Sequence, residues 1–140
     1  MRLIVSCSVY LTEDVHRVQK AIENFFGVTS VEIIKKDDHS DIITTEITQA
    51  NLTNIRQIVH DKRIIDAVRV RFLRNRDKLC SAIFLDKQAA FVGKLRLLDN
   101  DNEDPPLGYI ELRIDFTTEP EFEKFLEWFS PPTKNGKIIV

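Results

Sequence analysis

The sequence predicts an α+β fold, with a single mixed or antiparallel sheet and helices packed mainly on one of its faces. Stretches that alternate apolar and polar residues, typical of half-buried strands, are interspersed with stretches whose apolar residues recur at helical spacing. The chain has 140 residues, enough for one domain that buries roughly two-thirds of its unfolded surface. Its hydrophobic content of 43% and charged content of 30% are ordinary for a globular protein.

The N-terminal part predicts a strand followed by a helix. Residues 2–10 alternate cleanly and predict the strand. Thr12 is expected to cap the helix, with Glu13 and Asp14 in its first turn, where the helix dipole favours negative charge. The helix is expected to end at Gly27, because glycine readily adopts the left-handed conformation that terminates helices.

The middle of the chain predicts a hairpin, two helices and a strand. Two β-rich runs, 31–35 and 41–48, flank a short polar stretch and favour a hairpin. Two helical patterns follow, with a break expected near Asp61, and the second carries apolar residues from 64 to 72. Residues 80–85 predict a short buried strand.

Asp86 is expected to cap a short helix, residues 87–92, which Gly93 ends. Residues 95–98 and 109–116 predict two more strands, the second with strict alternation.

The last predicted helix begins near Thr118, with Pro120 at an early position where its missing N–H costs little. Residues 131–140 are expected to form a loose tail after it. We find no internal repeat, linker or low-complexity tract, so residues 1–140 are expected to form a single domain.

The compartment and redox state follow from what the sequence lacks. No apolar run approaches the roughly 20 residues that a membrane span needs. The first residues lack the apolar segment and cleavage site of a signal peptide, so we expect a cytoplasmic protein. In that compartment Cys7 and Cys80 are expected to be reduced thiols, with Cys7 on the apolar face of the first strand.

Charge is distributed unevenly along the chain. The net charge of −2 argues against indiscriminate polyanion binding by the whole molecule. Residues 56–96, however, carry 11 Lys and Arg against 4 Asp and Glu, whereas residues 97–129 carry 2 against 10. A chain with one basic and one acidic block can present a basic face whatever its net charge.

The basic block includes the second of the two adjacent helical patterns. With the apolar residues facing inward, a helical wheel places Lys62, Arg63, Arg69 and Arg74 on the outward side. Arginine suits phosphate, because its planar guanidinium donates two parallel hydrogen bonds. A solvated helix face is the alternative interpretation of the same pattern.

No recognisable catalytic or metal constellation is present. The three histidines show no zinc-like pairing with the cysteines, and there is no nucleophile elbow or glycine-rich phosphate loop. Residues 99–104 place oxygen side chains as a calcium loop does but lack its glycine and its final glutamate, so a solvated acidic turn is expected. The sequence therefore predicts a protein that is not an enzyme and needs no cofactor.

Three segments resemble a known family. LDKQAAFVG at 85–93, KRIIDAVRVRFLR at 62–74 and PPLGYIELRI at 105–114 resemble a small archaeal family described as an RNA-binding domain of otherwise unknown function. The resemblance implies a fold similar to that of ribosomal protein L five, and kinship with predicted exosome-associated subunits. The chain departs from the family pattern at Asp86, where Asn is common, and at Tyr109, where Pro is frequent.

We therefore expect a non-catalytic RNA-binding module that recognises RNA backbone and shape through a basic face. No exposed aromatic strand is visible, and Trp128 is expected to pack at a helix edge or a subunit contact. The alternative is a protein-interaction or dimeric scaffold that uses complementary basic and acidic surfaces. The expected phosphate contacts are Arg63, Arg69, Arg74, Arg76, Lys87, Lys94 and Arg96, with Gln88 as a base or sugar contact.

Overall fold

A five-stranded antiparallel sheet forms the centre of the protein. The computed structural model describes residues 1–27, 31–35, 40–99, 108–134 and 137–138. The strand order is β2-β3-β1-β5-β4, and each neighbouring pair is antiparallel, which confirms the α+β class with one main sheet. The strands are β1 (Arg2–Tyr10), β2 (Glu32–Lys35), β3 (Ser40–Ile47), β4 (Cys80–Asp86) and β5 (Tyr109–Asp115).

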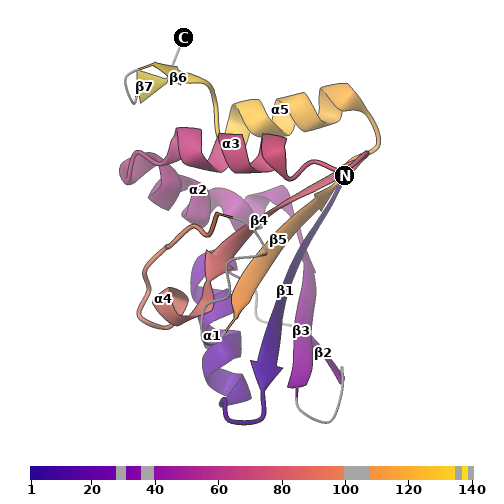
Figure 1. Ribbon diagram of the computed structural model, residues 1–140, viewed down its shortest axis with the longest axis vertical. Helices are drawn as coiled ribbons and strands as arrows, with labels where there is room; N and C mark the ends of the chain where they lie inside the picture. The colour runs from indigo at the N-terminus through magenta and orange to yellow at the C-terminus, as the bar shows by residue number, and fades with distance from the viewer. Residues whose placement is uncertain (28–30, 36–39, 100–107, 135–136, 139–140) are drawn as a thin grey trace.

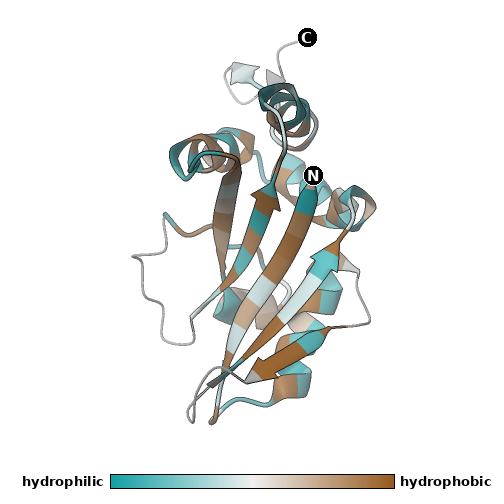
Figure 2. Cartoon of the chain, turned by 90° about the vertical axis from the view of Figure 1, so that its right-hand side faces the viewer, coloured by the Kyte–Doolittle hydropathy of each residue, from teal (hydrophilic) through white to brown (hydrophobic). Residues whose placement is uncertain are grey.

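The helices lie on one side of this sheet. In Figure 2 the strands lie in front of the helices, so the viewer looks onto the face of the sheet that no helix covers. The helices α3 and α5 are stacked at the top of Figure 1, and the short α4 lies lower, beside α1. The helical elements are α1 (Val15–Phe26), η1 (Gln49–Leu52), α2 (Thr53–Asp61), α3 (Ile65–Arg74), α4 (Lys87–Phe91) and α5 (Glu119–Phe129).

The alternation of β1 explains why only one face is covered. Side chains of successive strand residues point to opposite faces, so one set enters the core and the other set meets solvent. Leu3, Val5, Cys7 and Val9 are buried, whereas the residues between them are only half-buried. Because β1 pairs with both β3 and β5, it fixes the register of the whole sheet.

Helix α5 packs on α3 and covers one end of the hydrophobic core. The ring of Phe72 on α3 meets Phe125 and Phe129 edge-on, with centroids 5.6 Å and 6.0 Å apart. Edge-to-face contacts of this kind stabilise a core beyond the area they bury. Trp128 lies at the edge of this cluster, half-exposed, with the guanidinium of Arg56 5.2 Å from its ring centroid. Its helix-edge position agrees with the expectation.

Three local expectations differ from the structure. The cap of α1 is Asp14 rather than Thr12, because the Asp14 carboxylate accepts a hydrogen bond from the N–H of His16 at 2.9 Å. Residues 95–98 are not a regular strand: the segment pairs with β4 through a single bridge, Leu85 to Leu97. Part of the tail that was expected to be loose forms a hairpin of β6 (Thr133–Lys134) and β7 (Lys137–Ile138).

Of the helices in the described ranges, none combines the length and the apolar character that crossing a membrane requires.

The two cysteines occupy different environments, which leads to a first prediction. Burial raises the pKa of Cys7 to about 12, so this thiol forms almost no thiolate at mildly alkaline pH. Cys80 is partly exposed. We expect a thiol-specific reagent to modify one thiol in the native protein at mildly alkaline pH, and two after denaturation. Peptide mapping should identify Cys80 as the native site, and rapid native labelling of Cys7 would contradict its burial.

Candidate nucleic-acid interface

The expected RNA contacts fall into two groups. Arg63, Arg69, Arg74 and Arg76 lie on or beside α3. Gln88 lies in α4, which is well below α3 in Figure 1, and Lys94 and Arg96 lie in the segment after α4, whose end at residues 98–99 contacts α3. The structure therefore does not gather all the predicted cations into one patch, and each group has to be judged separately.

In the α3 group, Arg76 is neutralised within the molecule. Its guanidinium forms two hydrogen bonds with the carboxylate of Glu119 on α5, one of them 2.5 Å from Nη1 to Oε1, and the pairing lowers the pKa of Glu119. The same guanidinium lies 5.2 Å from the ring centroids of Phe116 and Phe122. Arg76 thus ties α5 to the end of β5, and its charge is largely used there.

Two other α3 arginines bind backbone carbonyls. Arg69 donates to the carbonyl of Ser130 at 3.1 Å, and Arg74 donates to the carbonyl of Asp99. Because Arg69 also shares a groove of about 240 Å³ with Glu123 and Glu127 of α5, a phosphate there would meet carboxylates. Arg69 and Arg74 keep their positive charge, but their hydrogen bonds hold neighbouring segments of the chain in place.

The outward face of α3 is more apolar than the helical wheel predicted. Val70 and Leu73 are 53% and 50% exposed, whereas Arg71 is folded back onto Leu98 and Asp99. Arg63 remains exposed at the start of the helix, with φ of 57°, a left-handed conformation uncommon for arginine. Of the four cations that the helical wheel placed outward, Lys62, Arg63 and Arg74 are exposed and Arg69 is half-buried.

The second group surrounds α4. Gln88 and Lys94 are exposed, and their side chains have no hydrogen-bond or ion-pair partner among the described residues. Arg96 is 53% exposed in its side chain and pairs with Asp86 at 3.3 Å. Asp86 is only 13% exposed and also caps α4, so this is a half-buried pair that holds part of the Arg96 charge.

The start of α4 is not an anion site. Asp86 occupies the cap, and its carboxylate accepts a hydrogen bond from the N–H of Gln88 at 3.1 Å. A phosphate placed there would lose that donor and meet the carboxylate charge. A phosphate near α4 would therefore contact the cations, not the backbone N–H groups at the start of the helix.

Sequence reasoning missed a third cation beside α4. Arg17 on α1 is exposed and lies over the ring of Phe91 on α4, with Cζ 5.2 Å from the ring centroid. Lys94 and Arg96 lie in one segment and Arg17 in another, so no local sequence pattern links Arg17 to the other two. Only the packing of α1 against α4 brings Arg17 close to the other two. We refer to the region formed by α1, α4 and the segment after α4 as the α4 corner.

The expectation for Lys87 is wrong. Its side chain is fully buried, and its ammonium donates to the carboxylate of Glu13 and to the carbonyl of Ser8, both at 2.7 Å. The ammonium also lies 5.1 Å from the ring centroid of Tyr10. Lys87 therefore cannot contact a phosphate in this structure. It connects α4 to the turn between β1 and α1.

This buried pair constrains the corner strongly. Glu13 Oε1 accepts from Lys87 and from the N–H of Tyr10, whereas Oε2 is buried without a hydrogen-bond partner among the described residues. A buried ion pair with an unsatisfied oxygen adds little net stability, but removal of one partner leaves an uncompensated buried charge.

We therefore predict that Lys87→Met lowers the free energy of unfolding by about 3–5 kcal/mol, because the Glu13 carboxylate loses its counter-charge. Urea unfolding followed by circular dichroism measures the loss. The double variant Glu13→Gln/Lys87→Met should recover most of it, since no charge is then buried. A loss below about 1 kcal/mol in the single variant would show that the pair is not buried as described.

A second motif meets the first at this corner. Gly108, the last residue of the Pro-Leu-Gly motif in the sequence, has φ of 83°, which favours glycine. A Cβ at this position would lie 3.4 Å from the hydroxyl of Tyr10. The Tyr10 ring is thus confined by Lys87 and by Gly108, and both belong to segments that carried the family resemblance.

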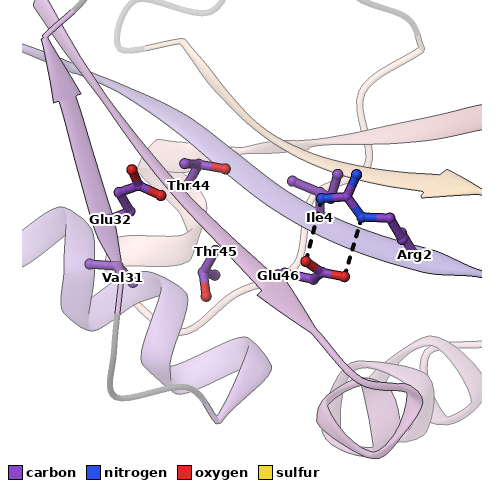
Figure 3. Close-up of a pocket in the computed structure, with 7 residues that line it drawn as sticks. All are labelled: Arg2, Ile4, Val31, Glu32, Thr44, Thr45 and Glu46. Atoms are coloured by element: carbon purple, nitrogen blue, oxygen red, sulfur yellow. Dashed lines mark hydrogen bonds and ion pairs between the residues drawn. The ribbon is translucent and has the colours of Figure 1, made fainter.

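The uncovered sheet face carries shallow hollows. The hollow at the β1–β3 end, about 400 Å³ in volume, is lined by Arg2, Glu32 and Glu46, among others, and is drawn in Figure 3. Figure 3 shows Arg2 directed at Glu46, with Nε–Oε1 and Nη2–Oε2 distances of 3.3 Å and 3.4 Å. Arg2 is the one cation among the described residues that line this hollow, and it is paired beside a second carboxylate, so the hollow does not suit a polyanion.

Within the part of the chain that the structure describes, no three His, Cys, Asp or Glu residues come together as a metal site would need. The acidic stretch considered as a calcium loop, residues 99–104, lies outside the described residues except for Asp99.

Comparisons with known proteins agree with the resemblance. A family model described as RNA binding matches residues 2–116. A UPF0201 protein of Aeropyrum pernix is 31% identical over 142 residues, covering 99% of this chain and 91% of that protein. The crystal structure of a UPF0201 protein from Methanococcus jannaschii has a TM-score of 0.84 at 25% identity, with 100% of both chains covered. A DUF54 protein structure from Methanothermobacter thermautotrophicus has a TM-score of 0.62 at 17% identity, covering 89% of this chain and 96% of that one, and shows the fold alone.

The fold and the family match thus identify a small α+β domain of an RNA-binding family. The chain belongs to this family, and the relatives that it matches over nearly their whole length are archaeal UPF0201 proteins. The likeness to ribosomal protein L five and the kinship with exosome-associated subunits stay predictions. The matched residues end at 116, so α5 lies beyond the segment that defines the family.

Proposed function

We propose that the protein is a non-catalytic RNA-binding module whose backbone contacts lie at the corner formed by α1, α4 and the segment after α4. The observation that carries the proposal is the family match over residues 2–116. The corner is favoured over α3 because the Lys94 side chain is unpaired among the described residues and Arg17 is exposed beside it, whereas most α3 arginines hold the fold.

The electrostatics of the corner set the expected strength of binding. Arg17, Lys94 and Arg96 supply three cations, but Asp86 and Asp14 lie close to them in the chain or in space. Each phosphate neutralised on a single strand contributes about −0.7 to the slope of log affinity against log salt concentration. Three contacts therefore predict a slope of about −2, modest for a nucleic-acid binder.

The proposal is tested by filter binding of a single-stranded RNA oligonucleotide at about 50 mM and about 200 mM salt. We expect Lys94→Ala/Arg96→Ala to weaken binding at low salt and to reduce the slope by about 1.4, because two phosphate contacts are lost. The double variant Arg63→Ala/Arg74→Ala tests the α3 group in the same assay.

Arg2→Ala is the matched control, because it removes an exposed arginine at the opposite end of β1 from the corner. It should leave the slope unchanged. If the α3 variant flattens the slope and the corner variant does not, the interface lies on α3. If the wild-type protein binds no RNA at about 100 μM, the proposed function is wrong.

A second candidate function is a protein-interaction or dimeric scaffold. It is favoured by Val70 and Leu73, two half-exposed apolar side chains one helical turn apart on the outer face of α3. Light scattering tests it: an oligomer that Val70→Lys/Leu73→Lys converts to a monomer would support the scaffold. A wild-type monomer would remove self-association as its function.

A further inference from the structure

A hollow on the uncovered sheet face lies next to the α4 corner and has no part in the contacts proposed so far. It occupies about 330 Å³ where the last residues of β1 meet the first residues of β5. Its walls include Tyr10, Tyr109, Ser6, Ser8 and Glu111. A volume near 300 Å³ lies at the lower end of the range for small-molecule sites and accommodates one nucleobase with its ribose.

Two aromatic rings flank this hollow. Tyr10 is 40% exposed, and Tyr109 is half-buried. Tyr109 is braced edge-on by Phe84, with ring centroids 5.0 Å apart and an interplanar angle of 78°. A partly exposed, immobilised ring is the element on which single-stranded nucleic acids stack their bases.

Contacts with Lys87 and Gly108 hold the Tyr10 side chain in place. The Lys87 ammonium lies 5.1 Å from the centroid of its ring, and its hydroxyl lies against Gly108, 3.4 Å from where a Cβ would be. A ring held in advance loses little conformational entropy when a base stacks on it. The buried ion pair of Lys87 and Glu13, which serves no phosphate, thereby acquires a role in positioning this ring.

The polar groups of the hollow suit a base edge better than a phosphate. The hydroxyls of Ser6 and Ser8 are half-buried and have no hydrogen-bond partner among the described residues, so they can donate to or accept from a ligand. The carboxylate of Glu111 gives the wall a negative charge. That charge repels phosphate and favours ligand groups that donate, such as exocyclic amines.

The hollow also adjoins the proposed backbone contacts. Asp86 pairs with Tyr109 in the register of β4 and β5, and Arg96 pairs with Asp86. A strand whose phosphates meet Arg96 and Lys94 therefore passes beside Tyr109. Phosphate contacts and a base site would then be used by one RNA strand.

We propose that this hollow binds a single unpaired RNA base, stacked against Tyr10 with its edge hydrogen-bonded by Ser6 and Ser8. The inference rests on the proposed function and deepens it, because it assigns the module to single-stranded or looped RNA rather than to duplex. Bases in a duplex are stacked on each other and cannot enter the hollow.

Fluorescence anisotropy with labelled single-stranded RNA and with a duplex of the same sequence tests the proposal. Tyr10→Ala is expected to weaken single-strand binding at least fivefold at every salt concentration, with an unchanged salt slope, because stacking releases no counterions. Duplex binding should not respond. Tyr10→Phe keeps the ring and should recover most of the loss.

Two further variants distinguish loss of the base site from loss of the folded structure. Ser6→Leu fills the hollow from β1 without touching the contact between Tyr10 and Lys87, and should weaken single-strand binding to a similar degree. Leu11→Ala is the matched control, because Leu11 is 75% exposed beside Tyr10 and does not line the hollow. Thermal unfolding confirms that each variant is folded.

The outcomes distinguish this inference from the proposed function. If wild-type protein binds single-stranded RNA and both Tyr10→Ala and Ser6→Leu stay within twofold of it, the base site is refuted while RNA binding stands. If wild-type protein binds neither RNA form at about 100 μM, RNA binding itself is refuted, and the base site with it.

Discussion

The arrangement of the α4 corner depends on the buried ion pair between Lys87 and Glu13. The ammonium is held by a carboxylate and a backbone carbonyl at 2.7 Å each, so α4 cannot separate from the turn between β1 and α1 without exposing or orphaning a charge. That constraint fixes three things together: the start of α4, the end of β1 and the ring of Tyr10. The ion pair gives the LDKQAA segment a structural role. Its lysine, Lys87, is buried and ion-paired, and its aspartate, Asp86, caps α4.

Internal ion pairs of this kind take up part of the charge of the basic segment. Arg76 is paired with Glu119, Lys87 with Glu13 and Arg71 with Asp99, so acidic residues elsewhere in the chain cancel much of the local positive charge. Exposed cations remain both at the ends of α3 and beside α4: Lys62, Arg63, Arg74 and Lys78 in the first group, and Arg17, Lys94 and Arg96 in the second. Binding that relies on few phosphate contacts needs another source of affinity, and base stacking on a preorganised ring is such a source.

The order and approximate limits of the elements were predictable because they depend on local periodicity and caps. Gly27 and Gly93, with φ of 64° and 74°, end or follow helices where the sequence placed them. The fate of individual cations was not predictable, because Lys87 and Arg76 find their carboxylates 74 and 43 residues away in the chain. The hollow was missed for the same reason: Tyr10 and Tyr109 are remote in sequence, and only the antiparallel pairing of β1 with β5 brings their strand ends together.

RNA is proposed to bind at the corner between α4 and the uncovered sheet face. Backbone amide chemical shifts measured during titration with single-stranded RNA test this most directly. The account predicts that the largest changes cluster at residues 6–10, 88–96 and 109–111, from three separate segments that meet only in the fold. Changes confined to α3 and α5, with residues 6–10 unaffected, would contradict it.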